Sequence, residues 1–268
     1  MINIVIILGT LSAMTVGSKN FAGKETMENS LYVGLSRQVV LERAMDMVAN
    51  NVANANTAGY RAQNPIFEEY ISKEKNDKND LSMVLDRGQY STTSPGSIQY
   101  TGNTYDVALQ GPGFIQVVTP SGDTQYTRAG NLTVNNDNEL VTTSGFKISG
   151  PGGNAVAIPS GSKEVVITKQ GEVTADGNAV GTIGVVEFDN VQELRPEGNG
   201  LYSSKDPGRP ATETVINQGS LEGSNVNSIQ ETTRMIDVLR TYQTTMRMIQ
   251  SEQERQVSAI QKLAQTSK

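Results

Sequence analysis

The sequence has no cysteine, no histidine and no tryptophan among its 268 residues. The absence of cysteine and histidine removes thiolate nucleophiles, Cys/His metal sites and the commonest general base of enzymes. The chain also has no means of forming a disulfide, so burial and assembly must supply its stability. We therefore expect a protein that is not an enzyme and that uses no metal, cofactor or small-molecule substrate.

Basic residues are scarce as well. The chain has 22 Lys and Arg against 28 Asp and Glu, a net charge of -6, and no basic cluster. Because binding to phosphates requires a basic face, nucleic acid is not an expected partner.

Helix-breaking residues are concentrated in the middle of the chain. All nine prolines lie between Pro65 and Pro210, the last glycine is Gly223, and Gly34 alone interrupts residues 24–58. The distribution predicts helical ends on either side of a middle that is rich in turns.

The C-terminal end is free of Gly and Pro from residue 224 to residue 265. Ser228 and Glu231 have the spacing of a capping box, which predicts a helix that begins near Ser228. Such a helix is about 60 Å long at 1.5 Å per residue and needs a partner along its length. Its apolar residues are spaced mostly by three and four and form one narrow stripe: Ile229, Met235, Ile236, Leu239, Tyr242, Met246, Ile249, Val257, Ile260 and Leu263.

The N-terminal end repeats this pattern between Asn29 and Asn54, and Gly59 falls where a C-terminal helix cap is expected. Two narrow stripes suit a helical hairpin or a coiled coil, but glutamines at several heptad core positions favour packing against many neighbours. The helical layer of an ordinary α+β domain is an alternative that spacing leaves open. The N-terminal stripe consists of Leu31, Leu35, Val39, Met45, Val48 and Val52.

A run of amides follows the N-terminal helix in "MVANNVANANTAGYRAQ", residues 47–63. Amide side chains can satisfy helix-end carbonyls and turn amides, and they can also bond to another chain. The residues alone leave both roles open.

The middle of the chain alternates strand-like runs with turn clusters. Residues 107–148 predict a meander of short antiparallel strands, and a second set follows over residues 165–188. Gly111-Pro112-Gly113-Phe114 is interpreted as a tight start of a strand, because no helix follows it to present amides to a phosphate. Asn135 to Glu139 is interpreted as a hairpin turn instead of a calcium loop, and no two carboxylates stand out as a glycosidase pair. Residues 72–80 are charged and predict a loop.

Three segments, in order, resemble bacterial flagellar axial proteins. The first is "LYVGLSRQVVLERAMDMVANNVANANTAGYRAQ", in which Ala49 to Asn54 and Asn56 to Tyr60 take the places of the family's ANNLAN-x-NT-x-G-[FY]. The second, "ALQGPGFIQVVTPSGDTQYTRAGNLTVNNDNELVTTSGFKI", is similar to the β domain of rod and hook proteins. The third, "GSLEGSNVNSIQETTRMIDVLRTYQ", resembles the signature before the long terminal helix. Together they identify the chain as a member of this family.

The resemblance implies an α+β fold in which long N- and C-terminal helices pack as a coiled-coil-like core domain beside a central, mainly antiparallel β domain. It implies a structural subunit that polymerises through its terminal helices into the periplasmic rod of the flagellar basal body and transmits motor torque to the hook. The expected partners are other copies of the chain, neighbouring rod proteins and the flagellar export apparatus.

Within the family, a proximal rod protein is favoured by Tyr60-Arg61-Ala62-Gln63 and by a chain too short for a hook protein. Leu239-Arg240-Thr241-Tyr242 departs from the Gln-Arg-x-[FY] of relatives. A distal rod or hook-family protein is an alternative, and a membrane-anchored β-domain adhesin is an alternative of another class.

The expected domain boundaries follow from these segments. Residues 1–26 are interpreted as a misassigned start, with a signal peptide or a short membrane-facing arm as alternatives. The remaining divisions are a helix and Asn-rich turn at 27–60, a linker and extended segment at 61–106, the β domain at 107–210, and a return segment and helix at 211–268.

The predicted assembly interface combines the two stripes with the two Asn-rich turns. It includes Leu31, Leu35, Val39, Met45, Val48, Asn50, Asn51, Val52, Asn54, Asn56, Gly59, Tyr60, Ser224, Asn225, Val226, Asn227, Met235, Ile236, Leu239, Tyr242, Met246, Ile249, Val257, Ile260 and Leu263.

Overall fold

The computed structural model describes residues 22–72 and 81–266. These residues form two compact units. The helical unit contains residues 22–39, 69–72, 81–85 and 243–266, and the β unit contains residues 40–68 and 86–242. The expectations for residues 1–21, and for most of the charged segment 72–80, lie outside the described residues.

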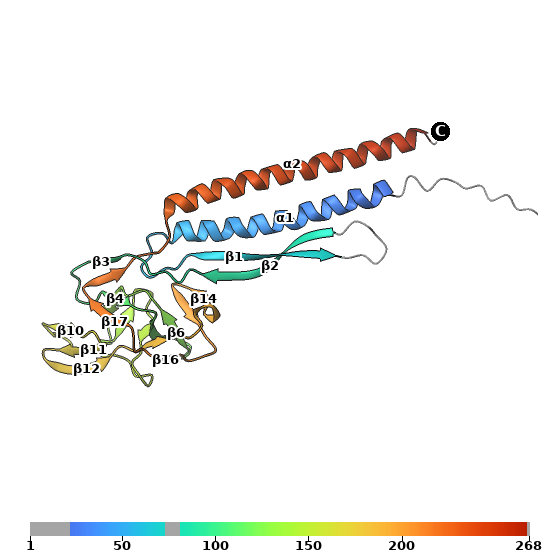
Figure 1. Cartoon of the computed structure of the whole chain (residues 1–268). Coiled ribbons are helices and arrows are strands. Elements are labelled where there is room, and N and C mark those ends of the chain that lie inside the picture. Colours follow the sequence, from blue (N-terminus) through green and yellow to red (C-terminus); the bar gives the residue numbers. More distant parts are fainter. Residues whose placement is uncertain (1–21, 73–80, 267–268) are drawn as a thin grey trace, which may run out of the picture. The chain divides into compact units, whose positions relative to one another are not determined.

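The described ranges contain two helices, eighteen strands and one short 3-10 helix. Figure 1 shows their order along the chain. The bounds are α1 (Ala22–Ala53), β1 (Gln63–Ser72), β2 (Leu81–Ser91), β3 (Ile98–Tyr100), β4 (Val107–Gln110), β5 (Phe114–Val118), β6 (Thr124–Thr127), β7 (Leu132–Val134), β8 (Leu140–Thr142), β9 (Lys147–Ile148), β10 (Val165–Ile167), β11 (Glu172–Ala175), β12 (Asn178–Thr182), β13 (Val185–Glu187), η1 (Val191–Glu193), β14 (Arg195–Gly198), β15 (Leu201–Ser203), β16 (Arg209–Pro210), β17 (Val215–Gln218), β18 (Ser220–Glu222) and α2 (Ser228–Thr266).

Helix α1 begins seven residues before the predicted Asn29 and ends at Ala53. Gly34 lies inside it, and an added Cβ would come within 3.0 Å of Ile249 Cγ1 on α2. A glycine in a helix interior costs about 1 kcal/mol relative to alanine. Here it lets the two helices approach closely within the helical unit.

Helix α2 begins at Ser228, as predicted, but its cap is different. The Asn227 side-chain oxygen accepts hydrogen bonds from the backbone N–H groups of Ile229 (3.1 Å) and Gln230 (3.2 Å). The predicted capping box of Ser228 and Glu231 is therefore wrong. Asparagine is as good an N-cap as serine, and Glu231 is used elsewhere.

The strands of the β unit pair antiparallel, which confirms an α+β fold with a mainly antiparallel sheet. The largest sheet has the order β14-β15-β6-β5-β9-β8-β7, and β13 pairs with both β5 and β16. The prediction of a meander is therefore only partly right. Strand β9 returns to pair with β5, and β4 pairs with β17. Short alternating runs predict strands but do not specify which strands pair.

Four smaller sheets complete the pairing. Strands β10, β11 and β12 lie side by side as one three-stranded sheet (Figure 1). The segment expected as a linker contains the pair β1 and β2 and also β3, which pairs with β18. The return segment after residue 210 thus reaches back to both β3 and β4 through β18 and β17.

The turn at Asn135 and the start of β5 after Gly113 have the form that the sequence predicts. Asn138 adopts φ 63°, and the Asn135 side chain accepts hydrogen bonds from the N–H groups of Asp137 and Glu139, which closes the hairpin between β7 and β8. Phe114 begins β5 directly after Gly113.

Two apolar clusters fill the β unit. A smaller, aromatic cluster surrounds Phe114, whose ring makes edge contacts with Phe188 and Tyr202 at centroid distances of 5.8 and 5.7 Å. The larger cluster consists of Val107, Leu109, Ile115, Val117, Leu132, Leu140, Ile148, Val156, Ile158, Val165, Ile167, Val173, Ala175, Ile183, Leu201 and Ile216.

Neither helix in the described ranges has an apolar stretch of the length that a bilayer crossing requires. The anchor that the adhesin alternative would use, residues 1–16, lies outside the described residues.

Leu140→Ala should destabilise the β unit by about 2–5 kcal/mol, because Leu140 is fully buried in the larger cluster and the substitution leaves a cavity. The measurement is urea unfolding followed by circular dichroism. Val166→Ala on β10, where the side chain is 41% exposed, is the matched control and should shift the midpoint little. Equal shifts for the two variants would contradict this assignment of the core.

Candidate assembly site

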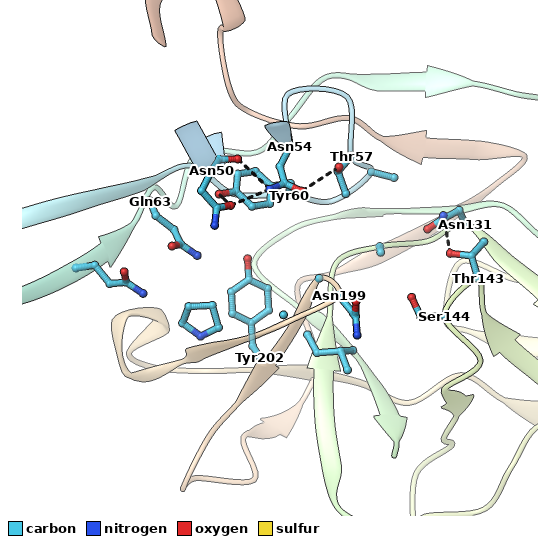
Figure 2. A pocket seen from close by; sticks show the side chains of 17 residues that line it. Asn50, Asn54, Thr57, Tyr60, Gln63, Asn131, Thr143, Ser144, Asn199 and Tyr202 are labelled. Atoms are coloured by element: carbon cyan, nitrogen blue, oxygen red, sulfur yellow. Dashed lines mark hydrogen bonds between the residues drawn. The ribbon is translucent and has the colours of Figure 1, made fainter. Parts of the chain in front are cut away.

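The Asn-rich turn closes the end of α1. The Asn54 side chain donates to the Asn50 carbonyl oxygen (2.9 Å) and to Asn50 Oδ1 (2.8 Å), and Thr57 donates to Asn54 Oδ1 (3.2 Å). The Tyr60 hydroxyl lies 3.2 Å from Asn50 Oδ1, which returns the chain to the helix end (Figure 2). These amides therefore serve the turn itself.

Asn51 is 1% exposed and makes four hydrogen bonds within its own chain. Its amide nitrogen donates to the Gln63 carbonyl (2.9 Å) and to Glu231 Oε2 (3.1 Å). Its oxygen accepts from the Gln63 N–H (2.9 Å) and the Tyr60 hydroxyl (3.1 Å). An asparagine amide offers two donors and one oxygen with two lone pairs, so none of its capacity remains for a neighbouring chain. Within the chain, Asn51 joins α1, β1 and α2.

Asn225 likewise bonds to the backbone next to the start of β1. Its oxygen accepts from the Ala62 N–H (2.7 Å), and its amide donates to the carbonyls of Ser94 (2.9 Å) and Thr92 (3.3 Å). Backbone groups at the ends of short strands lack partners within their own sheet, and each buried one left unpaired costs about 1–3 kcal/mol. Asn51 and Asn225 supply those partners.

Gly59 is not the helix cap that its position in the sequence predicted, because α1 ends six residues earlier. Its φ is +69°, and an added Cβ would overlap the backbone carbonyl of Arg128. Its N–H donates to the carbonyl of Glu222 (2.8 Å). A glycine is needed here because the turn passes directly over the backbone of Arg128.

A buried triad of charges lies beneath this turn. Glu222 is 2% exposed, and its Oε2 lies 2.6 Å from Arg128 Nη2 while its Oε1 lies 3.9 Å from Arg61 Nη2. The same carboxylate accepts a hydrogen bond from the Gly96 N–H (3.1 Å). The triad therefore ties together the chain after the Asn-rich turn, the end of β6 and the end of β18.

The arginines of the triad use most of their remaining donors on backbone carbonyls. Arg128 donates to Gly111 (2.8 Å), Gly113 and Leu109 (3.3 Å), and Arg61 donates to Thr93. Both guanidinium groups also lie over the Phe114 ring, at 5.8 and 5.7 Å from its centroid. Arg61 Nε is the one buried side-chain nitrogen or oxygen in the described ranges without a partner.

Burial shifts the pKa values of two groups in the site. It lowers the pKa of Arg128, and the Glu222 carboxylate opposes that shift. Burial, with the nearby Tyr202 and Glu231, raises the pKa of Tyr60 to about 12. At neutral pH the Tyr60 hydroxyl is thus protonated and can donate to the two asparagines.

The predicted interface residues fall into three classes of solvent exposure. Val48, Asn51 and Gly59 are buried. Half-buried are Leu31, Met45, Val52, Asn54, Tyr60, Ser224, Asn225, Val226, Met235, Tyr242, Met246 and Ile249. Exposed are Leu35, Val39, Asn50, Asn56, Asn227, Ile236, Leu239, Val257, Ile260 and Leu263. The buried set and several of the half-buried residues meet at the turn, whereas the exposed apolar residues are distributed along the two helices.

Sequence reasoning missed Arg61, Arg128 and Glu222 as site residues. Each is a charged residue inside an otherwise neutral motif, in Gly59–Gln63, Tyr126–Gly130 and Gly219–Gly223. That isolation was an available signal, because a charge among small and apolar residues is often buried with a partner. The site has no nucleophile with an adjacent base, and in the described ranges no three Asp or Glu side chains are placed to hold a metal ion.

Comparison with known protein families matches three segments of the chain. The flagellar hook protein FlgE/F/G D1 domain matches residues 108–175, the C-terminal region of the flagellar basal body rod FlgEFG proteins matches 217–262, and the flagella basal body rod protein family matches 31–61. Arg61, Arg128 and Glu222 come one from each matched segment, so the triad joins all three.

Relatives match over most of the chain. The flagellar basal-body rod protein FlgF of Caulobacter vibrioides is 35% identical over 88% of this chain and 98% of its own length. FlgF of Mesorhizobium japonicum is 34% identical over 90% of this chain and 100% of its own length. FlgG of Bacillus subtilis is 30% identical over 85% of this chain and 96% of its own length.

Fold, site and comparisons define a structural subunit of an axial assembly. The chain belongs to the flagellar basal-body rod proteins. Its function is that of a structural rod subunit, and its location is the rod of the flagellar basal body.

Glu222→Gln should cost about 3–5 kcal/mol of stability, because it leaves two buried guanidinium groups without their anion. Urea unfolding at neutral pH measures this loss. Glu139→Gln, which breaks a half-exposed bridge to Lys147, is the control and should cost less than about 1 kcal/mol. A comparable small cost for Glu222→Gln would show that the triad does not hold the site.

Tyr60 should ionise late in an alkaline titration followed by tyrosinate absorbance. Its pKa in the folded state, about 12, exceeds the ordinary value of about 10. The fold therefore favours the neutral phenol, and this contribution to stability is full below pH 10 and lost as pH rises through 12. Tyr60→Phe should remove one late-ionising group and leave those of Tyr126 and Tyr202, whose pKa values burial also raises. An unchanged titration curve would refute this environment for Tyr60.

Proposed function

We propose that the chain polymerises head to tail through its terminal helices into a tubular rod that transmits motor torque to the hook. The proposal rests on one observation. Apolar side chains that belong to the stripe of each helix remain exposed. Leu35 and Val39 on α1 are 53% and 57% exposed, and Ile260 and Leu263 on α2 are both 66% exposed.

A helix that exposes its apolar stripe needs a partner surface. Isolated apolar residues on a surface are ordinary, but a row of them at helical spacing is typical of an interaction face. A coiled-coil-like core formed by these helices from many copies and from neighbouring rod proteins would bury the row. Because a contact between two different faces repeats without closing, such an assembly grows as a filament.

The turn between α1 and β1 gives this assembly a stiff joint. Asn51, Asn225 and the triad fix the ends of both helices within the β unit through hydrogen bonds and buried charges. A load applied to the helix ends would then pass to the β unit without a flexible link. Asn50 and Asn56 stay exposed, and we propose that they and the exposed stripe residues contact neighbouring subunits, while Asn51 positions them.

The relatives favour one subtype. Relatives named FlgF are 35%, 34% and 30% identical, whereas those named FlgG are 30% or 29% identical. We therefore propose a rod protein of the FlgF type. The proximal position in the rod, passage through the flagellar export apparatus and the lack of catalytic activity are parts of the same proposal.

Ile260→Asp should abolish incorporation into the rod and swimming in soft agar, because a charge placed in an apolar contact loses its hydration without a partner. Gln261→Asp is the matched control, since Gln261 is the next residue on α2 and is also exposed. It should retain motility. Circular dichroism of both purified variants checks that the fold is intact, and normal swimming with Ile260→Asp would refute the proposed helix interface.

A further inference from the structure

A groove of about 580 Å³ lies in the β unit, bounded on one side by the Asn-rich turn (Figure 2). Its lining carries amide and hydroxyl groups and no charged residue. We call it the amide groove, and its amide side chains are Asn50, Asn54, Gln63, Gln89, Asn131 and Asn199. A chain in which 19% of residues are charged has here a sizeable neutral surface.

Some side-chain amides of this lining have unused hydrogen-bonding groups. Asn54 and Asn131 bond to Thr57 and Thr143, but the side-chain amides of Gln63, Gln89 and Asn199 have no partner among the residues that the structure describes. Asn199 adopts φ 50° between Gly198 and Gly200, so a turn holds it in a left-handed conformation at the groove. Neutral amides that both donate and accept fit an uncharged polar partner with backbone groups of its own.

The same subunit carries an uncharged, exposed segment elsewhere. All residues from 98 to 104, with the sequence Ile-Gln-Tyr-Thr-Gly-Asn-Thr, are exposed, and Tyr100 is 84% exposed. Strand β3 begins this segment and pairs with β18 alone among the described strands, so its other edge is open. An open edge with an exposed aromatic is a feature of strands that accept a partner.

The exposed segment is also held in place. The N–H groups of Thr101 and Gly102 donate to the Gly219 carbonyl (2.8 and 3.1 Å), and the Thr101 hydroxyl donates to Asp106 (2.7 Å). The Tyr100 ring lies so near Gly219 that an added Cβ there would be 3.2 Å from the ring. A surface that is already ordered loses less entropy on binding, which favours its use as an anchor.

We propose that residues 98–104 of one subunit dock in the amide groove of a second copy. A filament needs two different complementary faces on each subunit, and these two are uncharged, exposed and distinct. Tyr100 and the backbone beside it would supply the groups that Gln89 and Asn199 lack. The inference rests on the proposed function as a polymerising rod subunit, and it adds a contact between β units to the contacts of the helices.

The absence of cysteine allows a direct test. Two differently tagged copies are expressed in the same flagellated cells, one with Gln99→Cys or Thr101→Cys beside the anchor and the other with Asn199→Cys. After mild oxidation, purified basal bodies are analysed on non-reducing gels. The expected result is a disulfide-linked dimer that carries both tags, since a disulfide forms only when the two Cα atoms come within about 7 Å. Asp123→Cys, in an exposed turn between β5 and β6, replaces the anchor cysteine in the control and should give no such dimer.

The outcomes separate the two proposals. Tagged chains that are absent from basal bodies would overturn the proposed polymerisation and this inference with it. Chains that are present but do not cross-link would overturn the docking contact alone. Protection of the Asn199→Cys thiol from a thiol reagent, without a cross-link to either anchor cysteine, would also overturn the docking contact. It would indicate that something else occupies the groove.

A charge pair gives a second measurement that does not depend on cysteine chemistry. Asn199→Asp should reduce the swimming diameter at least two-fold, and adding Gln99→Lys, at an exposed position of β3, should restore it, because the new ammonium would meet the new carboxylate across the contact. Asn154→Asp, in an exposed loop, is the control and should swim normally. Failure of Gln99→Lys to restore swimming would overturn the contact.

Discussion

The Glu222 carboxylate is the point on which the rest of the β unit depends. It neutralises two buried arginines, one from the chain after the Asn-rich turn and one from the end of β6, and it accepts from a third segment at Gly96. Without this anion the two guanidinium groups would repel each other in a poorly hydrated site. Three segments distant in sequence are thus held at one place by a single side chain.

Two asparagines add hydrogen bonds to the contacts that the buried charges make. Asn51 and Asn225 bond to the backbone at and just before the start of β1, so hydrogen bonds hold both helix ends and the strand together. Part of the apolar stripe of each helix remains exposed in the subunit.

Much of the fold was predictable from sequence. The helical ends, most strands between residues 107 and 188, and the hairpin turn at Asn135 followed from periodicity and turn chemistry. The pairing of β9 with β5, the pair β1 and β2, and the return of β17 and β18 to β4 and β3 did not. Alternation of apolar residues marks a strand but is the same whichever strand lies beside it.

The three motifs and the helix breakers are local patterns along the chain, so they were sufficient to identify a rod-family subunit with helical ends. The roles of particular residues became clear from the folded structure. Asn51 proved to be an interior clamp, Gly59 a point of close approach, and Glu222 the shared partner of Arg61 and Arg128. These roles depend on which distant backbone groups and charges lie within hydrogen-bonding reach, and folding alone brings those groups together.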